Sequence, residues 1–291
     1  MATIKVINAI KKYGDTFALN NITLNLEENK IYGLLGRNGA GKTTLLNVIN
    51  NRIFLSDGTI SIDNKSLLED KSGLGKIYFM TEQDLYPQGM KVKEIFKWTG
   101  EFYPNFDMKY ALELSKKFEL NINKRIKELS TGYSSICKLI NTMASGAEVL
   151  MFDEPVLGLD ANHREMFYSE LMESYIEKPK TIVLSTHIIE EVAQLLERVV
   201  IIVDGKVIKD ESVEELLKGC YCVSGLNKNI DYYIENKNCI STDEMAAYKS
   251  AVILGENGDN EKKDQKKLEL EVTKVELQKL FIHLTSKGGI K

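Results

Sequence analysis

The chain has 291 residues, 43% hydrophobic and 27% charged, with 38 Lys and Arg against 42 Asp and Glu, a formal net charge of −4. The hydrophobic share excludes a disordered chain, and the slightly acidic balance argues against nucleic acid as a partner, because nucleic-acid binding usually needs a basic surface. No apolar run reaches 18 residues, so we expect the chain not to span a membrane by itself. It opens on a strand pattern without an apolar signal segment, and its four cysteines predict reduced thiols of a cytosolic protein.

Residues 1 to about 90 alternate short β-branched runs with turn signals. This pattern predicts strands over residues 3–8, 22–26, 30–35, 59–63 and 76–80. The pair Asp57-Gly58 lies between two apolar runs and predicts a hairpin turn.

Residues 91 to about 145 are predicted to be helical. Apolar residues recur at helical spacing in two groups, Ile95, Phe96, Thr99 and Phe102, then Ala111, Leu112, Leu114, Phe118 and Leu120. Pro104 separates the two groups, and Asp107 is expected to cap the second helix.

Residues 146–218 return to an alternation of strands and helices. Short, nearly continuous apolar runs over residues 148–152, 181–185 and 199–203 predict a buried, mostly parallel sheet. From about residue 219 the pattern changes to a small α+β appendage. We expect strands at residues 220–223, 251–254 and 268–272, a solvated loop or hairpin tip at 255–267 and a helix over 275–284.

The clearest local motif is a phosphate-binding loop (P-loop). It consists of Gly36-Arg37-Asn38-Gly39-Ala40-Gly41-Lys42-Thr43-Thr44, which follows an apolar strand and opens a helical pattern. The glycines let the backbone wrap a phosphate chain, and the helix presents its positive end to the same anion. In this motif Lys42 reaches the β- and γ-phosphates, and the hydroxyl of Thr43 is offered to Mg²⁺.

Two further apolar strands deliver polar residues toward the same edge of the predicted sheet. Asp153 and Glu154 end one of them, and His187 follows the other. Asp153 suits coordination of Mg²⁺ through water, and Glu154 suits orienting or deprotonating an attacking water. His187 is placed to contact the γ-phosphate and to sense its loss.

These motifs, in this order, resemble the ATPase subunits of ATP-binding cassette (ABC) transporters over residues 3 to about 215. The resemblance implies an α/β fold: a P-loop NTPase core, an antiparallel β arm and an inserted helical subdomain at about 91–145. It also implies that Tyr13 stacks on adenine, that Gln83 contacts Mg²⁺ and the attacking water, and that Asp160 lies in a loop at the dimer contact.

The family signature falls at Leu129-Ser130-Thr131-Gly132-Tyr133, where the usual pattern is Leu-Ser-Gly-Gly-Gln. The second glycine and the serine remain, so Ser130 and Gly132 still offer a hydroxyl and a backbone N–H to a γ-phosphate at a helix start. A working site and a degenerate site in an asymmetric pair both stay open, and Tyr133 is either functional or a surface aromatic.

The resemblance implies that ATP and Mg²⁺ are bound, that a second ATPase subunit completes each site in a homodimer or heterodimer, and that a separate membrane permease is powered. We expect residues 1–218 to form the ATPase domain and 219–291 an accessory domain. The chain is expected to lie at the cytoplasmic side of the membrane. The stretch 84–90 either receives a helix of the permease or caps the helical subdomain.

The function expected from these features is ATP hydrolysis coupled to export of a peptide, drug or lipid-like cargo. The alternatives are an ABC ATPase without a transport role and a regulatory nucleotide-binding module that does not hydrolyse ATP.

Overall fold

The computed structural model describes residues 2–286. By its internal contacts the chain divides into two compact units, Met1–His187 with Val200–Asp210 and Ile188–Val199 with Glu211–Lys291. Within residues 2–286, none of the helices combines the length and apolarity that a membrane crossing requires.

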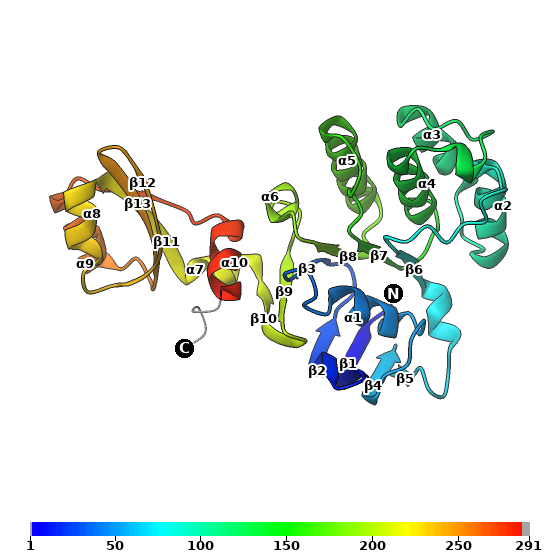
Figure 1. Ribbon diagram of the computed structural model, residues 1–291, viewed down its shortest axis with the longest axis horizontal. Helices are drawn as coiled ribbons and strands as arrows, with labels where there is room; N and C mark the ends of the chain where they lie inside the picture. Colours follow the sequence, from blue (N-terminus) through cyan, green and yellow to red (C-terminus); the bar gives the residue numbers. More distant parts are fainter. Residues whose placement is uncertain (1, 287–291) are drawn as a thin grey trace. The chain divides into compact units, whose positions relative to one another are not determined.

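The first unit begins with an antiparallel sheet, the β arm, in the order β2-β1-β4-β5 (Figure 1). Its strands are β1 (Ile4–Tyr13), β2 (Thr16–Leu26), β4 (Asp57–Ile62) and β5 (Lys65–Ser66). Tyr13 pairs with Thr16 across a two-residue turn at the end of β1. This turn leaves the Tyr13 ring at a strand end, 54% exposed.

The predicted hairpin turn at Asp57-Gly58 is wrong, because both residues belong to β4 and Asp57 pairs with Ile10 of β1. Gly58 has φ +93°, and a Cβ added there would lie 2.4 Å from the carbonyl oxygen of Asn8. The glycine therefore serves a close approach of two strands at a register shift.

The second sheet has the order β10-β9-β3-β8-β7-β6. Its strands are β3 (Ile31–Leu35), β6 (Ile77–Met80), β7 (Val149–Asp153), β8 (Thr181–Thr186), β9 (Arg198–Val203) and β10 (Lys206–Ser212). Strands β3, β8, β7 and β6 pair in parallel, and every residue of β3, β7 and β8 is buried. The prediction of a buried, mostly parallel sheet is confirmed.

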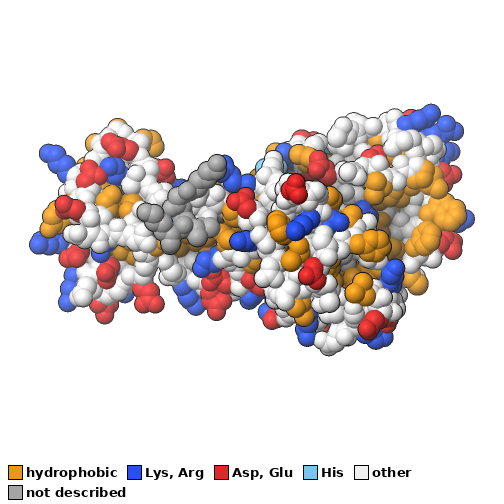
Figure 2. Space-filling view, turned by 60° about the horizontal axis from the view of Figure 1, so that its bottom comes forward, with side chains coloured by type: hydrophobic (Ala, Val, Ile, Leu, Met, Phe, Trp, Pro, Cys, Tyr) orange, Lys and Arg blue, Asp and Glu red, His pale blue; other side chains and the backbone are white. Residues whose placement is uncertain are grey.

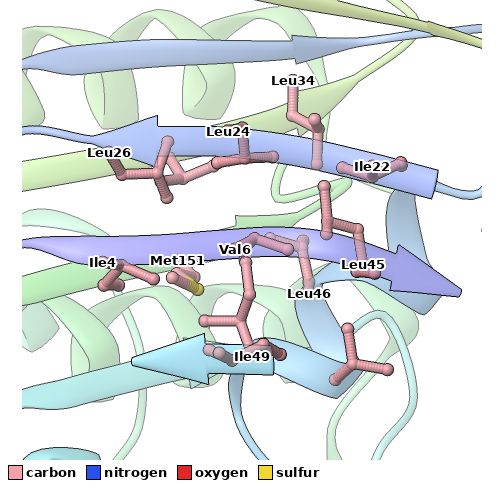
Figure 3. Close-up of a cluster of buried hydrophobic side chains, with 14 of the residues drawn as sticks. Ile4, Val6, Ile22, Leu24, Leu26, Leu34, Leu45, Leu46, Ile49 and Met151 are labelled. Atoms are coloured by element: carbon pink, nitrogen blue, oxygen red, sulfur yellow. The ribbon is translucent and has the colours of Figure 1, made fainter. Parts of the chain in front are cut away.

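The main core of this unit lies between the β arm and the parallel sheet. Helix α1 (Lys42–Ile49) contributes Leu45, Leu46 and Ile49, which gather with residues of the arm such as Val6 and Ile22 (Figure 3). Helix α5 (Ala161–Glu177) lies on the other side of the parallel sheet (Figure 1). Because α1 is anchored through its apolar face, its first turn is fixed at the edge where β3 ends.

The helical insert contains α2 (Val92–Phe102), α3 (Met108–Lys117) and α4 (Thr131–Met143), with a short 3₁₀ helix, η2 (Ile126–Glu128), between α3 and α4. Another 3₁₀ helix, η1 (Ser72–Lys76), precedes β6. The predicted cap is confirmed, because the Asp107 side chain accepts a hydrogen bond from the Tyr110 N–H at 2.9 Å.

Phe102, one of the apolar residues whose spacing predicted this helix, belongs to α2 but is 74% exposed. It is the last residue of the helix, and the next residue, Tyr103, turns inward and donates its hydroxyl to the Ile77 carbonyl at 2.8 Å. Figure 2 shows hydrophobic side chains gathered toward the side of the molecule where Figure 1 has α2, and elsewhere in that view acidic and basic side chains are interspersed.

The second unit contains a βαββαβ arrangement in a sheet of order β12-β13-β11-β14, in which the neighbouring strands are antiparallel. This order is that of a ferredoxin-like fold. The elements are α6 (Ile189–Val192), α7 (Val213–Lys218), β11 (Cys220–Leu226), α8 (Asn227–Ile234), β12 (Asn238–Met245), β13 (Tyr248–Leu254), α9 (Asp259–Lys267), β14 (Glu271–Thr273) and α10 (Leu277–Thr285).

Two expectations for this unit are wrong. Residues 259–267, expected to be loop, form α9, which has no apolar stripe to reveal it. The helix is held by the buried Gln265, whose amide donates to Tyr233 Oη and Asn257 Oδ1, both at 2.8 Å. The strand expected over 268–272 is reduced to Glu271–Thr273, because Leu268 and Leu270 pack into the core of this unit instead.

Candidate active site

Parallel pairing brings the polar segments of the first unit to one edge of its second sheet. Leu35 pairs with Thr186 and Asp153 pairs with Ser185, so β3, β8 and β7 end side by side. The carboxyl edge of a parallel sheet is where ligands bind in such folds. The phosphate-loop motif, the Asp153-Glu154 pair and His187 all follow directly from these three strand ends.

The loop between β3 and α1 is shaped by its glycines. Gly41 directly precedes α1 with φ +111°, and a Cβ there would lie 2.4 Å from the carbonyl oxygen of Ala18. Gly39 also lies in the left-handed region, at φ +81°, and borders open space. Consecutive turns of this kind point backbone N–H groups into a concave surface that favours an anion.

Lys42 opens α1 and is buried, with only 7% of its surface exposed. Its Nζ donates to the Gly36 carbonyl at 2.8 Å and lies 3.8 Å from Glu154 Oε1. Burial lowers the pKa of the Lys42 ammonium, while the carboxylates of Glu154 and Asp153 act in the opposite direction. The ammonium is thus held over the loop by one carbonyl and by acidic neighbours.

Asp153 is fully buried, and its two carboxylate oxygens differ in their hydrogen bonding. Oδ1 accepts from the Ser185 hydroxyl at 2.9 Å, whereas Oδ2 has no hydrogen-bond partner among the residues that the structure describes. Burial raises the pKa of Asp153, and the nearby hydroxyls of Thr43 and Ser185 oppose this. A buried carboxylate oxygen without a donor, next to the Thr43 hydroxyl, matches the oxygen ligands that Mg²⁺ prefers.

Glu154 has the strained backbone conformation of the site, with φ +49°. Its N–H donates to the Ser185 carbonyl at 2.8 Å, which fixes the turn after β7. The side chain then lies between Lys42 and His187, whose Nδ1 is 2.9 Å from Glu154 Oε2. Such an outlier at a site of convergent charges is characteristic of functional positions.

These groups border a hollow of about 510 Å³, called here the phosphate hollow. It is lined by Ala18, the loop residues Asn38, Gly39, Ala40, Gly41, Lys42, Thr43 and Thr44, and by Glu82, Glu154, Leu157 and His187. Gln83 does not line it. Instead Gln83 lines a separate hollow of about 330 Å³, the insert groove, together with Arg52, Tyr78 and Leu85.

The signature segment lies at the start of α4. Ser130 caps the helix by accepting from the Tyr133 N–H at 3.3 Å, and a Cβ on Gly132 would lie 3.1 Å from the Gly158 carbonyl oxygen. Ser130 and Thr131 line a third hollow, the signature hollow, of about 350 Å³, which also includes Glu154. Among residues 2–286, none of 129–133 lines the phosphate hollow of its own chain.

Asp160 and Tyr13 lie outside the phosphate hollow as well. Asp160 caps α5, accepting from the His163 N–H at 2.9 Å, and its other oxygen is 2.8 Å from His163 Nδ1. These hydrogen bonds lower the pKa of Asp160, and the one from the His163 backbone N–H has the largest effect. The exposed ring of Tyr13 has Lys11 Nζ 5.1 Å from its centroid.

Comparisons with known proteins decide the family. A family model described as ABC transporter matches residues 19–157. The chain is 33% identical over 208 residues to the ABC transporter ATP-binding protein NatA of Bacillus subtilis, covering 68% of this chain and 83% of NatA. The chain belongs to the ABC transporter ATP-binding proteins.

Other members of the ABC family agree with this assignment. The ABC transporter ATP-binding protein YtrB of Bacillus subtilis is 28% identical over 249 residues, covering 84% of each chain. The dimeric structure of MJ0796, a bacterial ABC transporter cassette, superposes with a TM-score of 0.65 at 28% identity, covering 72% of this chain and 98% of that one. The fold predicted from the sequence is therefore confirmed as that of an ABC cassette.

A polar stripe on α4 of this ABC subunit was not among the features predicted from the sequence. Ser134, Lys138 and Asn141 follow one another at intervals of four and three residues. Ser134 is half-buried and the other two are buried, on a helix whose remaining buried positions are mostly apolar. This spacing places the three side chains on one face of the helix. A polar stripe inside an apolar helix was the available signal, because buried polar groups require partners.

Replacing Tyr13 with alanine is expected to weaken ATP binding by about 1 kcal/mol, or roughly fivefold, because an aromatic stacking surface is removed. Titration calorimetry with ATP measures the change. Trp98→Ala is the matched control, since Trp98 is an equally exposed aromatic, 52% against 54%, on α2. An affinity unchanged in Tyr13→Ala would show that the ring has only a structural role.

Proposed function

We propose that this chain is the ATP-hydrolysing subunit of an ABC transporter and that it powers a separate membrane permease. The observation that carries the proposal is the position of Glu154, held between Lys42 and His187 at the phosphate hollow. A carboxylate fixed in this way can orient or deprotonate a water that attacks the terminal phosphate.

In this proposal the other residues hold the nucleotide. The backbone of Gly36–Gly41 and the ammonium of Lys42 bind the phosphate chain. Thr43 and Asp153 hold Mg²⁺. Gln83, which faces the insert groove in this structure, becomes a further ligand when the adjoining loop turns it toward the phosphate hollow. The metal, when bound, neutralises charge on the phosphates. His187 orients Glu154 and contacts the γ-phosphate, and Tyr13 stacks on adenine.

We propose that two such subunits, identical or different, complete each other's sites. Ser130 borders the signature hollow, and neither Ser130 nor Gly132 lines the phosphate hollow of its own chain, so both are available to the nucleotide of a second subunit. Asp160 and its loop lie beside the signature helix, since Ser135 Oγ donates to the Leu157 carbonyl at 3.2 Å. The γ-phosphate would then hold the two subunits together until it is removed.

The finer assignments are also proposals. We assign residues 1–218 to the ATPase domain and 219–291 to an accessory domain; residue 1 and residues 287–291 of this assignment lie outside the described part of the chain. The permease would hold the chain at the cytoplasmic side of the membrane. Export of a peptide, drug or lipid-like cargo follows from the resemblance of the signature to some exporter subunits, whereas relatives are named for both nucleoside import and Nod factor export.

Reconstitution with a candidate permease, a membrane protein that binds this chain in a pull-down from solubilised membranes, tests the proposal. Both proteins are placed in vesicles with the ATPase subunit outside, and ATP hydrolysis and accumulation of labelled candidate cargo are measured. The expected result is hydrolysis stimulated by the membrane protein and cargo accumulating inside the vesicles, which corresponds to export from the cell. Hydrolysis unaffected by the membrane protein would favour an ABC ATPase without a transport role, and loss of preloaded cargo would indicate import.

A further inference from the structure

The loop that carries Gln83 is attached to the signature helix at three points. Ser134 Oγ donates to Asp84 Oδ2 at 3.3 Å, and Asn141 Nδ2 donates to Tyr86 Oη at 2.8 Å. Between them, Lys138 Nζ donates to two backbone carbonyls, that of Glu82 at 2.6 Å and that of Thr81 at 3.2 Å. All three donors come from the polar stripe on α4.

The central contact differs from the other two because it holds the backbone itself. The carbonyls of Thr81 and Glu82 immediately precede Gln83, so their positions determine the direction in which the chain leaves β6 and enters the loop. Lys138 is buried, with 8% of its surface exposed. A buried ammonium without acceptors is costly, and the two carbonyls offset this cost only in one position of the loop.

The position of the loop decides which side chain faces the phosphate hollow. Glu82 lines both the phosphate hollow and the signature hollow, while Gln83 lines the insert groove. Lys138 itself borders the insert groove on one side and the signature hollow on the other. It therefore lies between the hollow that Gln83 faces and the hollow that contains Ser130 and Glu154.

We infer that Lys138 is a positioning residue for ATP hydrolysis: by holding the Thr81 and Glu82 carbonyls it sets the orientation of Gln83 and couples the loop to the signature helix. The inference rests on the proposed function, because it assigns a role to the loop of a hydrolytic site. Lys138 does not line the phosphate hollow, so it acts through the loop and not on the nucleotide. Movement of α4 would be passed to the backbone of the loop through this ammonium.

The test compares Lys138→Met, Lys138→Gln and Lys138→Arg in the full chain. Methionine keeps the length of the side chain and removes all donors, whereas arginine keeps a charge and several donors. We expect Lys138→Met to lower kcat for ATP hydrolysis by about tenfold with KM for ATP changed less than twofold. We expect Lys138→Arg to recover at least half of the wild-type kcat, because a charged donor to carbonyls is restored.

Amide hydrogen exchange supplies a readout that a general loss of stability would not produce. In Lys138→Met, exchange is expected to accelerate in residues 81–86 and to remain unchanged in β7 and α1. Lys138→Gln keeps a polar side chain and serves as the second variant if Lys138→Met does not fold. It is expected to show a smaller loss of kcat and a smaller acceleration of exchange in residues 81–86. A normal kcat in Lys138→Gln or Lys138→Met, or exchange accelerated throughout the first unit, would overturn the inference.

Glu154→Gln in the same assay separates this inference from the proposed function. If the wild type hydrolyses ATP, Glu154→Gln does not, and the Lys138 variants match the wild type, only the role of Lys138 is contradicted. If the wild type does not hydrolyse ATP or Glu154→Gln is as active as the wild type, the proposed function itself fails.

Discussion

Replacing Glu154 with glutamine is expected to slow ATP hydrolysis by about 10²-fold or more while ATP still binds. The amide has the shape of the carboxylate and can still meet His187 Nδ1, which lies 2.9 Å from Oε2. It cannot accept a proton from an attacking water, and it removes the negative charge 3.8 Å from Lys42 Nζ. This variant should therefore bind ATP normally but hydrolyse it slowly.

Two measurements check this expectation: the rate of phosphate release, and light scattering with ATP and Mg²⁺ present. If ATP closes two subunits, the slow variant should accumulate as an ATP-bound dimer. Glu113→Gln on α3 is the matched control, because that carboxylate is exposed and pairs with Lys109, away from the phosphate hollow. Only monomer in Glu154→Gln with ATP bound would contradict the proposed dimer, and a hydrolysis rate near that of the wild type would contradict the role of Glu154.

Replacing Lys42 with alanine is expected to lower kcat/KM for ATP by about 10²-fold. A hydrogen bond to a charged group contributes about 1.5–3 kcal/mol, and at the upper end this corresponds to about 10²-fold. Unlike Glu154→Gln, this substitution should weaken binding as well as hydrolysis, because the ammonium is directed at the phosphates in the bound state as well as in the transition state. Calorimetric titration with ATP and a phosphate-release assay measure the two effects.

The control for Lys42→Ala is Lys65→Ala. It makes the same change in net charge on the β arm, where the ammonium is exposed and pairs with Asp70. We expect its ATP affinity and turnover to match those of the wild type. Near-normal turnover in Lys42→Ala would remove the basis for assigning the phosphate hollow to ATP.

The strands predicted for the parallel sheet agree with the observed ones because each is a run of apolar residues of the right length, whereas the predicted strands 3–8 and 22–26 cover only parts of β1 and β2. Residues 181–185 illustrate this, since the observed β8 adds only one residue. The predicted cap at Asp107 was also correct, because a cap depends on residues three positions apart. The predictions failed where a contact remote in sequence decided the structure: Gly58 faces Asn8 of another strand, and α9 is held by one buried side chain, Gln265.

The residues of the candidate site could be predicted from the sequence, but the contacts between them could not. The phosphate loop, Asp153 and Glu154 could be read directly from the sequence, since each is a contiguous motif next to a strand. That their side chains meet, with Glu154 between Lys42 and His187, is a consequence of parallel pairing among β3, β7 and β8.

The sequence by itself determined which chemical groups this protein carries and which helix or strand end presents each one. Only the tertiary structure decided which of the neighbours Glu82 and Gln83 faces the phosphate hollow. Their order along the chain leaves both directions open, and the direction is set by Lys138, more than fifty residues later, through two hydrogen bonds to the backbone. The physical reason is that a buried ammonium must find acceptors, and the acceptors it finds here are carbonyls of the loop itself.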